Sequence, residues 1–104
     1  MKQFDVFRNP NAASVRTVPW LLLIQSDLLD EFPTRMVAPL VRAGALALPA
    51  TRLNPSFKVE GETVYMLTQQ LGAVPKRYLK QAVVSLERHR TDIIGAIDFL
   101  LGGV

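Results

Sequence analysis

Two apolar segments near the N-terminus have the patterns of short β-strands. Residues 3–7 place Phe4 and Val6 on one side of the chain and Asp5 on the other, which is the period of a half-buried strand. Residues 18–25 (VPWLLLIQ) are apolar on both strand faces. We therefore expect both faces of this second strand to be covered, one by the core and the other by the core or a partner.

The middle of the chain predicts one more strand and a hairpin. Residues 36–41 are strand-like, and Pro39 predicts a sheet edge or a bulge because proline has no N–H to donate. Residues 57–59 and 63–68 alternate on either side of residues 60–61, a Glu-Gly pair. Glycine supplies the positive φ that a tight hairpin turn needs.

The last third of the chain changes to a helical period. Residues 74–75 (Val-Pro) predict a break, and residues 76–81 predict a single helical turn. Ser85 is the expected N-cap of a helix that Gly102 and Gly103 end. Its apolar stripe is expected to comprise Leu86, Ile93, Ile94, Ile97, Leu100 and Leu101. The predicted fold is mainly β with a C-terminal α-helix, a small bent antiparallel barrel or pair of sheets.

Composition narrows the class of protein. The 104 residues suffice for one domain, residues 1–104, and the 49% apolar against 20% charged content hints at a buried partner surface. Absence of cysteine excludes disulfides and thiolate metal sites. The N-terminus lacks the apolar core of a signal peptide, and the longest apolar run, residues 18–24, is shorter than the roughly 20 residues that span a bilayer. We therefore expect a cytoplasmic protein without membrane contact.

Charged and catalytic residue types give little support for an enzyme. The net charge of +3 is compatible with an acidic partner, but the Lys and Arg residues are scattered, so we expect a solvated surface without direct nucleic-acid contact. The only histidine, His89, has no orienting partner in the pattern. Asp27, Asp30 and Glu31 fit a hydrogen-bonded turn better than a metal site. We predict no catalytic residue, no metal and no cofactor.

Five segments in order resemble the CcdB family, the toxin half of plasmid and chromosomal toxin–antitoxin modules. They are FDVF, IQSDLLD, TRMVAPL, NPSFKVEGETVYMLTQQLGAVP and SLERHRTDIIGAIDFLLGG. The resemblance covers nearly the whole chain. It implies a dimeric SH3-like barrel with a C-terminal helix, and an activity of binding rather than catalysis. Family toxins poison DNA gyrase by wedging a dimer into the A subunit and trapping the cleaved DNA complex.

The resemblance also implies a gyrase contact at the C-terminus. The plasmid toxin of the family contacts gyrase through a terminal Trp-Gly-Ile. The matching positions here are Gly102, Gly103 and Val104, so the glycine is kept, the aliphatic is similar and the aromatic is absent. Four alternatives follow from this difference: weak gyrase poisoning, other gyrase contacts, another target, or an inert protein.

A partly disordered antitoxin neutralises family toxins by folding onto them, and the resemblance implies where it binds. The corresponding residues are Leu28, Leu29, Asp98 and Leu101. Leu28 and Leu29 stand among polar residues, so they are either exposed anchors for an amphipathic partner segment or a cover for the core beneath the turn.

Dimerisation and two other functions complete the expectations. Residues 18–25, residues 36–41 and the helix stripe hold more apolar surface than one small barrel needs, which predicts a two-fold dimer. A ribonuclease toxin on a related barrel is the alternative from another class, with His89 and neighbouring arginines as its only candidate site. A family member that binds only its antitoxin is the third.

Overall fold

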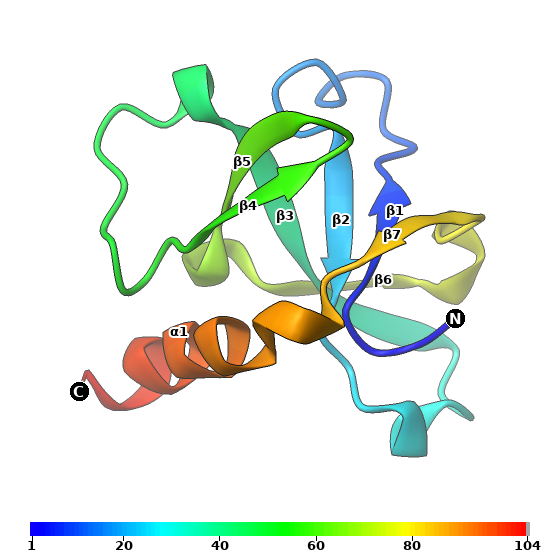
Figure 1. Ribbon diagram of the computed structural model, residues 1–104. Coiled ribbons are helices and arrows are strands. Elements are labelled where there is room, and N and C mark those ends of the chain that lie inside the picture. Colours follow the sequence, from blue (N-terminus) through cyan, green and yellow to red (C-terminus); the bar gives the residue numbers. More distant parts are fainter. Residues whose placement is uncertain (104) are drawn as a thin grey trace.

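The computed structural model describes residues 1–103 as a curled antiparallel sheet, a half-barrel, with one α-helix at its C-terminal end (Figure 1). The strands are β1 (Asp5–Arg8), β2 (Trp20–Leu23), β3 (Thr34–Arg42), β4 (Ser56–Val59), β5 (Glu62–Met66), β6 (Gly72–Pro75) and β7 (Ala82–Ser85). The helix is α1 (Arg90–Gly102). The predicted class, mainly β with a C-terminal helix, is confirmed.

Strand β3 is the long central strand of the sheet and pairs with three other strands. The strand order is β4-β5-β3-β2-β1-β7, and β6 pairs with β3 beside β5. The first half of β3, residues 34–37, pairs with β6, and its last residues, 40–42, pair with β5. One long strand thus carries two short strands on the same side, which turns the sheet into a half-barrel.

Pro39 therefore lies in the central strand, and the expectation of an edge or bulge is wrong. Its carbonyl accepts a hydrogen bond of 2.9 Å from the N–H of Leu67, in the segment that joins β5 to β6. The nitrogen and the carbonyl of a strand residue point to the same side. The missing N–H of Pro39 thus falls where β3 changes partners, so no ladder bond is lost.

Strand β2 is covered on both faces by the protein's own core. Trp20 and Leu22 belong to a large cluster that includes Ile93 of α1. Leu21 and Leu23 belong to a second cluster on the other face, together with Phe7, Val37 and Leu79. The expectation of two covered faces is confirmed, and the second face is covered within the chain.

The predicted hairpin forms between β4 and β5. Glu60 has a φ of 50° and Gly61 a φ of 81°, and Val59 pairs directly with Glu62. Two consecutive residues with positive φ define a type I′ turn, whose twist matches that of the flanking strands. The hairpin prediction is confirmed.

Strands β6 and β7 were not predicted from the sequence. The Val-Pro pair at 74–75, read as a break, lies in β6, and the predicted helical turn is a 3-10 turn at Lys76–Tyr78. Ser85 ends β7 rather than starting the helix, although its Oγ accepts a hydrogen bond of 3.1 Å from the N–H of Glu87. Both strands are four residues long and pair with strands distant in sequence, so no local alternation marks them.

Helix α1 buries only the first part of its apolar stripe. Ile93 is fully buried, whereas Leu100 and Leu101 are exposed. Figure 1 shows the C-terminal end of α1 extending away from the sheet. The helix ends as predicted at glycine, because Gly103 has a φ of 71° and its N–H donates to the carbonyl of Phe99 at 2.8 Å. No helix within residues 1–103 has the length and apolar content needed to cross a bilayer.

Candidate protein-binding surfaces

The acidic turn, residues 25–33 between β2 and β3, is held by its polar side chains. Ser26 Oγ accepts a hydrogen bond of 3.2 Å from the N–H of Leu28, which caps the 3-10 turn Asp27–Leu29. Asp27 Oδ1 accepts a bond of 2.7 Å from the N–H of Gln3 and so ties the turn to the N-terminal segment. These bonds are those that the turn interpretation of the acidic residues expects.

Gln25 closes the base of the turn. Its Nε2 donates to the carbonyl of Leu29 at 2.9 Å, and its Oε1 accepts from the N–H of Met36 at 3.0 Å. One amide thus connects the end of the 3-10 turn to the start of β3. The backbone of the turn is fixed at both ends without any apolar side chain.

Arg35, which we did not single out in the sequence, is the central support of this turn. Its side chain is 2% exposed although it carries a full charge. Its guanidinium donates to the carbonyls of Phe32, Thr34 (2.8 Å) and Asp30 (2.6 Å), and to Asp30 Oδ1 at 2.7 Å. The burial of Arg35 could have been predicted from strand alternation, because Arg35 is two residues before buried Val37 and therefore points to the same face of β3.

Several polar side chains of the turn form hydrogen bonds within the protein, whereas its large apolar side chains are exposed. Leu28 is 92% exposed, Leu29 47%, and Phe32 about as much as Leu29. Leu28 therefore does not cover the core, and of the two alternatives for the leucine pair the exposed anchor fits the geometry. This inversion of the usual arrangement is typical of a surface that another molecule covers.

The second predicted surface is the end of α1. Asp98, Leu101, Gly102 and Gly103 are all exposed, Leu101 to 79%. Val104, the third residue of the predicted gyrase contact, lies outside the described residues. Beside this end, the guanidinium of Arg52 stacks 4.6 Å from the ring centre of Phe99, a cation–π contact that fixes one side of the last two turns.

The two predicted surfaces do not come together within one chain. Figure 1 shows the end of α1 at the lower left and the acidic turn at the lower right, well apart from one another. A partner that touches both on one chain must therefore be a long segment. Leu28 and Leu29 are thus separated from Asp98 and Leu101.

His89 lies in a setting that suits packing better than acid–base chemistry. Its ring stacks at a tilt on Phe57, with 5.0 Å between ring centres. It lines a hollow of about 260 Å³ with Ser56, Phe57, Lys58, Thr63 and Arg88. None of these lining residues is a carboxylate that could orient the imidazole, as histidine general bases usually require.

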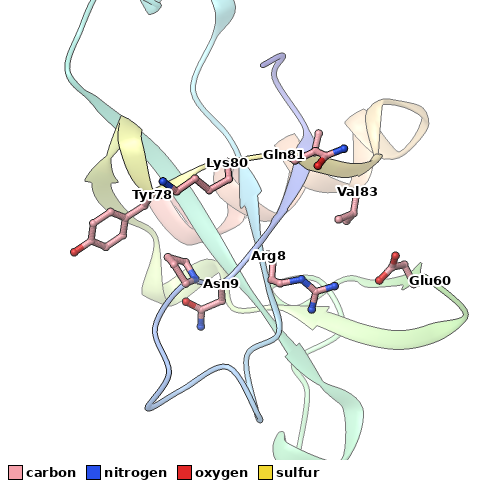
Figure 2. A pocket seen from close by; sticks show the side chains of 9 residues that line it. Arg8, Asn9, Glu60, Tyr78, Lys80, Gln81 and Val83 are labelled. Atoms are coloured by element: carbon pink, nitrogen blue, oxygen red, sulfur yellow. The ribbon is translucent and has the colours of Figure 1, made fainter.

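A larger cavity, of about 570 Å³, opens between the β4–β5 turn and β7. Figure 2 shows its lining, in which the side chains of Arg8 and Glu60 point toward one another from opposite walls and Lys80 stands to one side. The lining of this cavity contains no His, Ser or Cys. Within residues 1–103 no three His, Asp or Glu side chains gather as a metal site requires.

The geometry thus points to binding surfaces, and a comparison with known families agrees. The sequence model of one family, described as CcdB protein, matches residues 3–103. This match covers almost all of the 104 residues, including the acidic turn and the whole of α1. The toxins of that family belong to toxin–antitoxin systems and are not enzymes. The chain belongs to the CcdB family.

Proposed function

We propose that the chain works as one domain, residues 1–104, and as a cytoplasmic homodimer whose toxicity a cognate antitoxin neutralises by binding. The observation that carries this proposal is the exposure of Leu28 and Leu29 on a turn whose backbone is held by hydrogen bonds from the side chains of Gln25 and Arg35. A preorganised apolar anchor pair costs little ordering entropy on binding. Neither nucleic acid nor a membrane is needed as a direct partner.

The antitoxin is proposed to contact Leu28, Leu29, Asp98 and Leu101. Because the leucine pair and the helix end are far apart on one chain (Figure 1), the antitoxin segment must be long, or must reach the helix end of the second protomer. A segment that orders only on binding suits such a wide surface.

Leu28→Asp tests the antitoxin surface, with Leu48→Asp as a matched control. The two leucines are almost equally exposed, at 92% and 90%, but Leu48 lies in the loop between β3 and β4, away from the acidic turn. We expect Leu28→Asp to weaken binding of the antitoxin from the adjacent reading frame by at least about tenfold, or ~1.4 kcal/mol. Calorimetry measures both, and equal effects of the two variants would contradict the proposal.

The proposed target is the A subunit of DNA gyrase, contacted by Gly102, Gly103 and Val104. Gly102 lacks the aromatic side chain that forms the hot spot of the plasmid toxin, and such a side chain contributes about 2 kcal/mol or more. We therefore expect Gly102→Trp to strengthen gyrase poisoning by roughly thirtyfold. Gyrase-dependent DNA cleavage measures this, and an unchanged cleavage level would mean that the protein docks elsewhere or not at all.

Two other functions are distinguished by simple outcomes. RNA cleavage by pure protein that disappears in His89→Ala would support the ribonuclease alternative. The hollow that His89 lines has no carboxylate in its lining, which disfavours this alternative. Absence of growth arrest on expression without antitoxin, with antitoxin binding intact, would identify a family member that only binds its antitoxin.

A further inference from the structure

The acidic turn is a negative region on a protein of positive net charge. The chain carries 12 Lys and Arg against 9 Asp and Glu. Between Arg16 and Arg42 the only cation is Arg35, whose charge is buried against carbonyl oxygens and Asp30. Three exposed carboxylates lie in the same segment: Asp27, Asp30 and Glu31. The charge that this segment shows to a partner is therefore negative.

Cations from other segments border the turn without neutralising it. The N–H of Lys76 donates to the carbonyl of Pro33 at 2.9 Å, and Lys2 is next to Gln3, which bonds Asp27. Among residues 1–103 the ion pairs join Asp30 to Arg35, Glu62 to Arg42 and Glu87 to Arg90. Within these residues Asp27 and Glu31 form no ion pair, and Asp27 uses only Oδ1, in its bond with the N–H of Gln3, so both can meet an incoming cation.

The apolar part of this surface extends beyond the predicted leucine pair. Phe32 and Met36 are also exposed large apolar residues. The carbonyl of Leu29 accepts from both Gln25 Nε2 and the N–H of Phe32 (3.5 Å), and Gln25 also accepts from Met36. These bonds bring the backbones of Leu29, Phe32 and Met36 close to the Gln25 amide, and Leu28 precedes Leu29 in the chain. We call these four residues the turn patch.

A partner strand has no free edge to pair with at the start of β3, beside the acidic turn. The start of β3 is paired on one side with β6, through Thr34–Val37, and from Val37 onward on the other side with β2. An incoming chain must therefore bind through side chains. Leu28, Leu29 and Phe32 are all exposed within one short turn, and an amphipathic helix with anchors at i, i+3 and i+4 presents an apolar stripe that covers such a run.

We propose that the turn patch binds an amphipathic helix whose apolar stripe is flanked by Lys or Arg. Its apolar residues cover the turn patch, and its cations lie beside Asp27 and Glu31. Gln25 and Arg35 are positioning residues, because their bonds fix the backbone before the helix arrives. The inference rests on the proposed function, since it names the chemistry of the partner segment at one of the two proposed antitoxin surfaces.

Two synthetic peptides of about 16 residues test this chemistry. Both carry the same leucine stripe, and the flanking positions are Lys in one and Glu in the other. We expect the Lys peptide to bind the full chain at least about tenfold more tightly in fluorescence anisotropy, with the difference shrinking as salt rises. Glu31→Lys is expected to reduce that preference, and Leu28→Asp to weaken binding of both peptides, while Leu48→Asp leaves both unchanged.

Several results would overturn the inference. They are equal binding of the two peptides, tighter binding of the Glu peptide, a preference that Glu31→Lys leaves intact, and no binding of either peptide at high micromolar concentration. The proposed function fails separately, when the antitoxin from the adjacent reading frame does not bind the unaltered chain. If that antitoxin binds and Leu28→Asp weakens it, but the peptides show no cationic preference, the function stands and this inference falls.

Discussion

Arg35 determines more of the local structure than any apolar residue in the acidic turn. A buried charge is costly unless every donor is satisfied. Here the guanidinium satisfies three carbonyls and one carboxylate, all from residues 30–34. The cost of burying the charge is offset by bonds that no other side chain in the turn supplies, and the turn keeps one conformation as a result.

Replacing Arg35 should therefore destabilise the protein strongly. Arg35→Met keeps a long apolar stem but leaves the carbonyls of Phe32 and Thr34 without their side-chain donor, at a cost of about 3 kcal/mol. Arg42→Met is the matched control in the same strand, because Arg42 forms a half-exposed ion pair with Glu62 worth less than about 1 kcal/mol. Urea unfolding measures both, and equal losses would contradict the supporting role of Arg35.

At the residue scale, the pattern of residue types did not predict which side chains of the acidic turn are buried and which are exposed. Arg35 and Leu28 exchange their usual places, the charge inside and the leucine outside. The pattern of polar residues around Leu28 predicted a turn but left the direction of its side chain undecided, because direction depends on bonds such as that from Gln25 to Leu29. Contacts of this kind form only after the strands have placed both ends of the turn.

Gly95 within α1 and Gly103, the residue that caps its C-terminal end, differ in backbone conformation, and that difference sets the sign of a prediction. Gly95 is exposed within the helix and an added Cβ would meet open space, whereas Gly103 has a φ of 71°. Gly95→Ala should stabilise the protein by roughly 0.5–1 kcal/mol. Gly103→Ala should destabilise it by about 1 kcal/mol, because alanine resists the left-handed conformation. Shifts of the same sign in urea midpoint would contradict this account.

Elements encoded by adjacent residues were predictable, and elements completed by distant ones were not. The hairpin at Glu60–Gly61 and the glycine end of α1 are local signals, and both are confirmed. Strands β6 and β7 exist only because β3 and β1 pair with them, and Pro39 fits the central strand only because β3 changes partners there. Such pairings depend on the whole sheet, so a local pattern does not contain them.

At the scale of the whole molecule, the structure removes one of the reasons for expecting a dimer. Strand β2 needs no partner, since both of its faces are buried by the chain itself. Exposed large apolar side chains remain in the turn patch, at the end of α1, and at Met1, Leu48 and Tyr78. A two-fold interface presents the same patch twice, and Leu100, at the end of α1 and outside the proposed antitoxin and gyrase contacts, is placed to meet its own copy.

The unaltered chain should therefore sediment at twice its monomer mass at micromolar concentration. Leu100 is exposed at the free end of α1 and, unlike Leu101, is not among the proposed antitoxin or gyrase contacts. Burying it in a symmetric contact counts twice. We expect Leu100→Asp to weaken the dimer by at least about tenfold, or ~1.4 kcal/mol, because it also places two carboxylates together across the interface. Leu48→Asp is the control and should leave the dimer intact. A monomer mass for the unaltered chain would remove the dimer from the proposed function, and a dimer that survives Leu100→Asp would move the interface away from the helix end.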